Sequence, residues 1–208
     1  MLALGCIGAI LATGASRASD VPAGAYTLDK AHASLIFRVD HLGFSHFTAR
    51  FPEFDAKLQF DPAKPEQARV EVTVASGSLA IDNAPAGFLD DLRGPQWLDT
   101  GKFPQMSFRS TKVERSGTRG LRILGELQLH GVQRPVTLNA SFNGGYAGHP
   151  MDPHARIGFS ARGSFKRGDF GITAGIPAPG STMGVGDEVE VIVEAEFSGP
   201  AWSQKPRT

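Results

Sequence analysis

Cysteine is nearly absent from this chain of 208 residues, and its only copy is Cys6. Tryptophan and tyrosine are scarce, with two residues each, whereas there are 14 phenylalanines. Phenylalanine fills space without a polar group, so this composition indicates a large and dry interior. Neither charge is in excess, because 21 Lys and Arg balance 21 Asp and Glu. A neutral chain lacks the electrostatic attraction that drives binding to nucleic acid or to an anionic membrane surface, so we expect neither.

The beginning of the chain has the composition of an export signal. Residues 2–15 are small and apolar, carry no charge, and are too few to cross a bilayer as a helix. Ser16 and Ala18 supply the small residues that signal peptidase accepts before a cut. We therefore expect residues 1–18 to be a signal peptide and the protein to be periplasmic. A buried N-terminal helix and an acylated Cys6 are the alternatives. Removal of the leader would leave no disulfide, thiol nucleophile or cysteine metal ligand.

From Tyr26 onward, apolar residues recur at every second position, which is the period of a half-buried strand. Eight such segments run to Phe197, separated by turn-forming stretches such as SGTRG and HGVQRP. Each segment has one apolar and one mostly polar face, and the last alternates valines with glutamates. We predict an all-β domain over residues 19–208, an eight-stranded antiparallel barrel that hides its apolar faces by closing on itself. A two-sheet sandwich is the alternative.

One predicted strand changes the parity of its apolar positions. From Phe47 to Phe51 the apolar residues have odd numbers, and from Phe54 to Phe60 they have even numbers. One extra residue produces such a switch, so we predict a β-bulge or bend at Pro52–Glu53. Phe51 and Phe54 should then both point inward.

The segment 84–104 interrupts the strand pattern. Phe88, Leu89 and Leu92 would lie on one side of a short helix, and prolines and glycines make the rest a loop. A connection this long and apolar is typical of a lid or plug, although an ordinary packed crossover has the same composition.

Several motifs resemble the YceI-like family. They are YTLDKAHASLIFRVDHLGFSHFTARFPEFDAKLQFDP, FLDDLRGPQWLDTGKFPQMSFRST, GELQLHGVQRPVTLNASF, SFKRGDFGI and VGDEVEVIVEAEF, in the family's order from about Tyr26 to Phe197. The resemblance implies a lipocalin-like barrel that binds a polyisoprenoid or similar long-chain amphiphile in its lumen. It also implies export to the periplasm, no cofactor and no enzymatic activity. Trp97–Leu98 replaces a pair that is often aromatic in the family, and GIPAPGSTMG makes a fuller connection than usual.

The inward positions also favour a ligand. Ala49, Ala56, Ala140, Ala161 and Ala195 lie among phenylalanines, and small residues there would leave room along the barrel axis. A hydrocarbon chain gains about 0.8 kcal/mol for each CH₂ group that it buries. A completely filled core is the alternative, because it uses the same residues. The predicted ligand-binding residues are Phe37, Val39, His41, Phe44, Phe47, Ala49, Phe51, Phe54, Phe88, Leu92, Trp97, Phe103, Met106, Phe108, Ala140, Phe159 and Phe170.

The stretch RVDHLGFSHF, residues 38–47, brings two histidines and an aspartate close together in the sequence. A zinc site needs three or four converging ligands, and no pair of histidines in the chain has the spacing of a zinc protease. We therefore predict no metal and interpret the stretch as a hairpin at the barrel mouth, where His41 could meet a lipid head group. An enzyme that acts on such a lipid through Asp40, His41 and His46 is the alternative function.

Two further polar motifs have a structural interpretation. Arg167 and Asp169 in KRGDFGI could form a catalytic pair, but a local role for Asp169 with Phe170 packed inward is favoured. His130, in the turn HGVQRP, lacks a serine or aspartate partner. The expected function is therefore carriage of a long-chain isoprenoid lipid. A membrane would take part only as donor or acceptor of that lipid, and a homodimer is left open.

Overall fold

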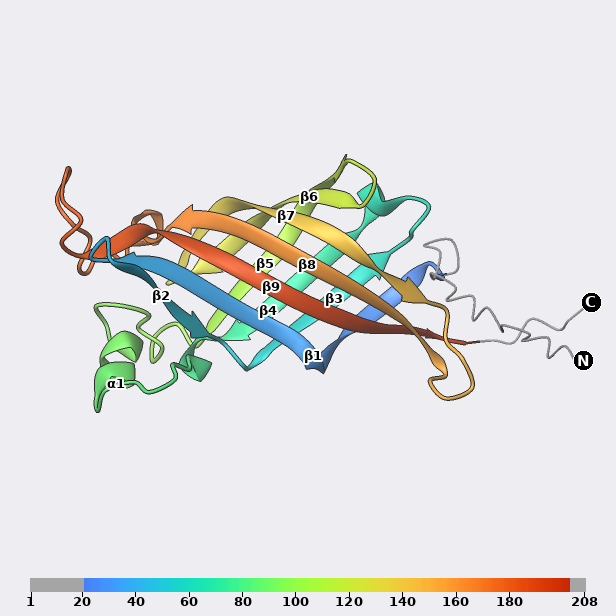
Figure 1. Cartoon of the computed structure of the whole chain (residues 1–208), viewed down its shortest axis with the longest axis horizontal. Helices are drawn as coiled ribbons and strands as arrows, with labels where there is room; N and C mark the ends of the chain where they lie inside the picture. The colour runs from blue at the N-terminus through green and yellow to red at the C-terminus, as the bar shows by residue number, and fades with distance from the viewer. Residues whose placement is uncertain (1–20, 203–208) are drawn as a thin grey trace, which may run out of the picture.

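A computed structural model of the chain describes residues 21–202, which form mainly β-strands (Figure 1). The predicted signal peptide, with its cut after residue 18, lies outside the described residues. The strands are β1 (Gly24–His41), β2 (Ser45–Arg50), β3 (Phe54–Phe60), β4 (Arg69–Ala75), β5 (Gln105–Ser116), β6 (Gly120–Leu129), β7 (Val132–Tyr146), β8 (His154–Lys166) and β9 (Val185–Ala201).

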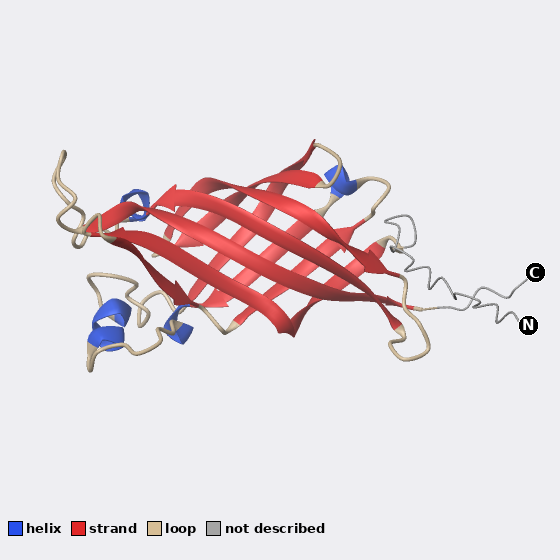
Figure 2. Cartoon of the chain, in the orientation of Figure 1, coloured by secondary structure: helices blue, strands red, loops and turns tan. Residues whose placement is uncertain are grey.

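The sheet closes on itself. Neighbouring strands are antiparallel in the order β1-β3-β4-β5-β6-β7-β8-β9, and β9 pairs back with β1 between Thr27↔Ser198 and His41↔Val185. Figure 2 shows the crossing strands of the resulting barrel, with loops at both ends. The remaining strand, β2, pairs only with β1 and lies outside the eight-stranded ring. The predicted eight-stranded antiparallel barrel is therefore confirmed, and a sandwich of two separate sheets is excluded.

The parity switch at residues 51–53 separates two strands. Phe51 and Phe54 are both buried, as predicted. The predicted bend at Pro52–Glu53 is confirmed by a bend at Glu53, but it separates two strands, because the two halves lie along different parts of β1. β2 pairs with Ile36–His41, whereas β3 pairs with Gly24–Thr27. Proline removes a backbone donor, so Pro52 cannot continue the ladder of hydrogen bonds between these two parts.

Within residues 21–202, helical structure is confined to short pieces. The predicted helix is α1 (Phe88–Arg93), and three 3₁₀ turns are η2 (Pro65–Gln67), η3 (Ser76–Ser78) and η4 (Arg167–Phe170). Gly87 precedes α1 with a φ of 81°, a conformation that favours glycine. Among residues 21–202, no helix has the length and hydrophobicity needed to cross a membrane.

The two ends of the barrel differ. We call the end where β1 finishes at His41 and β9 begins at Val185 the mouth end, and the opposite end the closed end. Aromatic rings fill the closed half: the Phe60 ring centroid lies 5.5 Å from that of Phe142 and 5.3 Å from that of Phe159. The Phe159 ring also meets the edge of Phe197 at 6.3 Å. Such contacts pack aromatic side chains across the interior of this half of the barrel.

Candidate ligand-binding cavity

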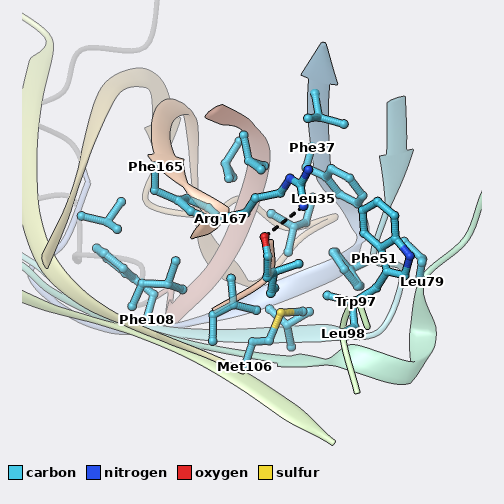
Figure 3. A pocket seen from close by; sticks show the side chains of 18 of the residues that line it. Leu35, Phe37, Phe51, Leu79, Trp97, Leu98, Met106, Phe108, Phe165 and Arg167 are labelled. Carbon is cyan, nitrogen blue, oxygen red and sulfur yellow. Dashed lines mark hydrogen bonds between the residues drawn. The ribbon is translucent and has the colours of Figure 1, made fainter. Parts of the chain in front are cut away.

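The mouth half of the barrel contains a cavity of about 330 Å³ (Figure 3). Its walls are almost entirely apolar and come from β1, β2, β4 to β9 and the segment between β4 and β5. The lining residues are Leu35, Phe37, Val39, His41, Phe47, Phe51, Val72, Val74, Leu79, Phe88, Leu92, Trp97, Leu98, Met106, Ser107, Phe108, Leu127, Leu129, Val136, Leu138, Phe165, Arg167, Ile172, Val185, Val189, Val191 and Val193. A volume of this size lies in the range of small-molecule sites.

The cavity reaches the protein surface at the mouth end. His41 is exposed to solvent and also lines the cavity, so the two spaces meet at the last residue of β1. Several inward side chains, such as Leu35 and Phe37, are only half-buried although they belong to the barrel interior. Their free surface faces the cavity, as Figure 3 shows for both residues. The interior is therefore not a completely filled core.

The segment between β4 and β5 forms one wall of this cavity. Backbone hydrogen bonds of 3.0 Å and 2.9 Å between Arg50 and Ala80 attach it to the outer strand β2. The Phe88 ring meets the Phe47 ring edge-on at 6.0 Å, and Trp97 and Leu98 also line the cavity. The segment thus covers the side of the barrel next to β2. Its movement as a lid stays a prediction.

Arg167 is the one cation in the cavity wall among the described residues, and only 4% of it is exposed. Its Nε donates a hydrogen bond to the carbonyl oxygen of Gly186 at 2.8 Å, and its Nη2 donates to that of Val185 at 2.7 Å. Its Nη1 donates to the carbonyl oxygens of Ile172 and Ala174 at 2.9 Å and 2.8 Å. These four bonds join the end of β8 to the start of β9 and to the loop between them.

The positive charge of Arg167 is stabilised by carbonyl oxygens and an aromatic ring, because no carboxylate among the described residues contacts its guanidinium directly. Burial lowers the pKa of its guanidinium, and the charge of Asp187 partly opposes that effect. Asp187 itself accepts a hydrogen bond of 2.8 Å from the backbone N–H of Gly168. The guanidinium carbon lies 5.2 Å from the centre of the Trp97 ring, a distance typical of a cation–π contact. The four carbonyl acceptors and the ring therefore solvate a cation at the edge of an apolar cavity.

Ten of the 17 predicted ligand-binding residues line the cavity: Phe37, Val39, His41, Phe47, Phe51, Phe88, Leu92, Trp97, Met106 and Phe108. The other seven lie elsewhere. Phe44 is 80% exposed outside the barrel, and Phe103 packs on the ring of His130 at 4.8 Å. Phe159 belongs to the aromatic cluster of the closed half, and Phe170 meets the edge of Phe165 at 5.2 Å. Ala49, Phe54 and Ala140 are buried in packed parts of the core.

The predicted origin of the empty space also needs correction. None of the alanines expected to leave room along the axis lines the cavity. Ala49, Ala56 and Ala195 pack in the main core, and Ala140 packs with Val113 and Leu121 in a separate small cluster. The space instead lies between larger side chains that do not meet across the mouth half. Small residues in this barrel allow close packing rather than a cavity.

The acid–base set proposed for an enzyme does not converge. Asp40 and His46 are partners across the β1–β2 hairpin and lie on the outer face, whereas His41 lines the cavity. The Asp40 carboxylate also accepts a hydrogen bond of 2.9 Å from the backbone N–H of Gly43, which holds the turn. These positions indicate a structural role for Asp40 at the predicted hairpin.

One group of side chains has the composition of a metal site. Donor atoms of Asp29, His32 and Glu196 lie within 4.8 Å of one another on the outer surface. Asp29 is already engaged by Arg156 and by His32, whose Nδ1 lies 3.0 Å from its carboxylate. These partners explain the cluster without a metal. The predicted absence of a bound metal stays a prediction.

Comparison with known proteins agrees with this architecture. The profile of the YceI-like domain matches residues 26–197. The chain belongs to the YceI-like family. A UPF0312 protein of Shewanella baltica is 37% identical to it over 189 residues, with 89% of this chain and 91% of the relative covered.

Solved structures resemble this YceI-like domain over most of its length. A Campylobacter jejuni YceI protein superposes with a TM-score of 0.65 at 29% identity, covering 83% of this chain and 96% of that one. A structure from Saccharophagus degradans, described as a polyisoprenoid binding domain, superposes with a TM-score of 0.59 at 16% identity, covering 85% and 99%. The second likeness is one of fold.

The YceI-like cavity includes residues that the sequence-based site prediction omitted. Most are inward residues of the predicted strands, such as Leu127, Leu138 and Val191. Arg167 is the most informative omission, because the sequence motif suggests only a pairing with Asp169, and no ion pair joins the two in the described residues. Strand parity could have identified it, since Arg167 follows the inward residue Phe165 by two positions. The predicted inward packing of Phe170 is confirmed by its 1% exposure.

Proposed function

We propose that this protein binds and carries a long-chain isoprenoid lipid, of the polyprenol or isoprenoid quinone type, without acting on it chemically. The observation that carries the proposal is the apolar cavity in the mouth half of the barrel, which opens at the exposed His41 and is enclosed by apolar side chains. An elongated hydrocarbon with one polar end matches this cavity, because its apolar tail can contact the walls while its polar end lies at the mouth. Each CH₂ group that enters the cavity contributes about 0.8 kcal/mol to binding.

In this proposal the lipid tail points toward the closed end and the head lies at the mouth. His41 and Arg167 are both neighbours of Val185, the first through strand pairing and the second through a hydrogen bond to its carbonyl oxygen. A head group near Val185 therefore meets an imidazole and a guanidinium. Positive charge at that place favours oxygen acceptors, such as quinone carbonyls or a phosphate, over an unsubstituted hydrocarbon end.

Two other considerations support this function. The Saccharophagus structure with the same fold is described as a polyisoprenoid binding domain. Residues 1–18 have the composition of a signal peptide, so we propose that the lipid is carried in the periplasm. A carrier in that compartment can meet a membrane as donor or acceptor of its lipid.

The test is the identity of the molecule that the protein holds when purified from its own host. Native mass spectrometry without detergent should show one lipid per chain, and solvent extraction should release an isoprenoid chain. Protein delipidated and then incubated with the extracted lipid should regain the same mass. A chain that is ligand-free when purified, and that takes up no polyprenol or isoprenoid quinone, would contradict the proposal.

A further inference from the structure

Two loops at the mouth end expose apolar side chains to solvent. Phe44, in the turn between β1 and β2, is 80% exposed, and Met183, in the loop that precedes β9, is 69% exposed. Among the described residues only one other large apolar side chain is so exposed, Met151 at 89%, and it lies between β7 and β8 at the closed end. Single exposed apolar residues are common on soluble proteins, so Phe44 and Met183 are informative only because they lie close to each other.

These two loops are in contact with each other. The backbone N–H of Leu42 donates a hydrogen bond of 2.8 Å to the carbonyl oxygen of Gly184. A Cβ atom built on Gly43 would lie 3.0 Å from the Cβ of Thr182, so the backbones approach closely. Figure 1 shows both loops together at the left end of the barrel, beyond the ends of the strands. Phe44 and Met183 therefore belong to one surface.

The same surface carries no ionised side chain of Asp, Glu, Lys or Arg. Residues 41–49 and residues 171–186 contain none of these four types. Apolar loops without charge can enter the interfacial layer of a bilayer without desolvating an ion, which would otherwise cost several kcal/mol. Other connections carry charges: Asp61, Lys64 and Arg119 at the closed end, and Asp90, Asp91 and Lys102 in the segment 84–104 at the mouth.

The surface also surrounds the cavity entrance. His41 and Val185 are direct neighbours of the two loops in sequence, and both line the cavity. A flat layer in contact with Phe44 and Met183 would therefore lie against the mouth. We propose that the mouth end docks on the surface of a lipid bilayer, with the side chains of Phe44 and Met183 inserted among the lipids. The choice of a bilayer as the partner rests on the proposed function, because the carried lipid resides there.

Flotation with lipid vesicles tests this docking. The purified protein is mixed with vesicles of phosphatidylcholine, or of phosphatidylcholine with phosphatidylglycerol, and the vesicle-bound fraction is measured at low and high salt. The variants are Phe44→Ser with Met183→Ser, and Met151→Ser as the matched control from the closed end. Bound lipid is measured by native mass spectrometry on the same samples.

We expect the wild type and the Met151→Ser variant to float equally on both kinds of vesicle and to be insensitive to salt, since no charge takes part. The affinity of the double variant for vesicles should fall at least about tenfold, because the apolar surface that inserts is lost. The amount of cargo lipid that it retains should be unchanged. Unaltered flotation of the double variant would refute docking by these loops. Flotation on anionic vesicles alone, with release by salt, would also refute it, since a charged surface would then be responsible.

A second copy of this chain is the other partner that could cover the surface. If wild-type protein stays off both kinds of vesicle while the double variant changes from dimer to monomer in sedimentation, the bilayer proposal is wrong. The lipid measurement separates the two proposals. Protein that floats through these loops but never holds a lipid would overturn the carrier function and leave docking intact, whereas lipid-loaded protein that never floats would overturn docking alone.

Discussion

Arg167 shows how one buried side chain can organise an opening. Its four hydrogen bonds reach carbonyl oxygens on both sides of the loop that precedes β9, so its planar guanidinium holds the end of β8, that loop and the start of β9 together. A buried cation is tolerated here because each of these carbonyl dipoles points at it. The same residue gives the cavity its positive charge.

We expect the Arg167→Met variant to lose about 2–5 kcal/mol of unfolding free energy, because four carbonyl oxygens lose their donor. Arg167→Lys should also be destabilised, since an ammonium has three donors and no planar fork. The control is Arg38→Met, which removes a partly exposed ion pair of 3.3 Å with Glu190 and should cost at most about 1 kcal/mol. Urea denaturation of the three variants measures the differences. Equal stability of Arg167→Met and Arg38→Met would contradict this account.

A second residue-scale prediction concerns Asp29 on the outer surface. Hydrogen bonds from His32 and then from Arg156 are the main reasons why the pKa of Asp29 falls from 3.8 to about 2. Because the folded state lowers this pKa, the interaction stabilises the protein above about pH 4 and is lost as the pH falls toward 2. The same hydrogen bond raises the pKa of His32, so the histidine's contribution is present at low pH and is lost as the pH rises through that raised pKa.

The Asp29→Asn variant should therefore melt at a lower temperature than the wild type near pH 5, where Asp29, His32 and Arg156 are all charged. The difference should shrink toward pH 2 and should decrease in part at high pH, where His32 is neutral and the Asp29 carboxylate keeps only its ion pair with Arg156. Thermal melting followed by circular dichroism across this range measures it. A difference that is the same at pH 2 and pH 5 would show that Asp29 acts by packing rather than by charge.

At the scale of elements, the segment between β4 and β5 forms part of the cavity wall, although its one bridge to a strand within residues 21–202 is the pairing of Arg50 with Ala80. It is attached by the pair of bonds between Arg50 and Ala80, by the ion pair between Arg50 and Asp82, by short local turns, and by ring contacts of Phe88 with Phe47 and of Trp97 with Arg167. Segments held in this way open locally more often than central strands do. The lining residues Phe88 and Leu92 would then lose contact with the cavity when α1 moves away.

We predict that amide hydrogens of residues 84–104 exchange faster than those of β8 and β9, and faster still after delipidation, because a bound tail contacts Phe88 and Leu92 in the wall. Hydrogen exchange followed by mass spectrometry, with and without the extracted lipid, measures this. The strands β8 and β9 serve as the internal control. Lipid-independent protection of residues 84–104 would identify the segment as a fixed crossover instead of a lid.

The strands themselves could be predicted from the sequence, because inward apolar and outward polar residues alternate along each antiparallel strand. The location of the cavity could not. Phe159 and Phe165 have the same parity on β8, yet the first packs in the closed half and the second lines the cavity. Alternation shows which residues point inward, but the height of each residue along the barrel depends on the register of distant strands. For the same reason the complete break between β2 and β3 was not evident from the parity switch alone.

At the scale of the whole molecule, the barrel combines an empty half with a packed half. Val191 lies in the wall of the first, and Ala140 lies in a small packed cluster of the second with Val113 and Leu121. Adding carbon atoms at the two positions should therefore have opposite consequences. In the empty half the extra atoms occupy space that a ligand would use, and in the packed half they have no space at all.

We expect Val191→Phe to retain less lipid than the wild type while delipidated protein melts at nearly the same temperature. Ala140→Leu should instead lose about 1–3 kcal/mol by overpacking, with normal lipid retention in the folded protein. Thermal melting of delipidated protein and lipid retention are measured together for both variants. If Val191→Phe destabilised the lipid-free protein and left retention unchanged, the cavity would not be the place where lipid binds.

The aromatic rings packed in the closed half favour a single entrance to the described barrel, at the mouth. A lipid in a cavity with one entrance leaves by the route through which it entered, and a second lipid cannot bind until the first has dissociated. Exchange between two membranes would then follow a ping-pong scheme, in which the protein departs from the donor before it serves the acceptor. Such a cavity does not by itself give lipid transfer a direction. The direction of net transfer would be set by the relative lipid activity of the two membranes, and an excess of acceptor would saturate the rate rather than reverse it.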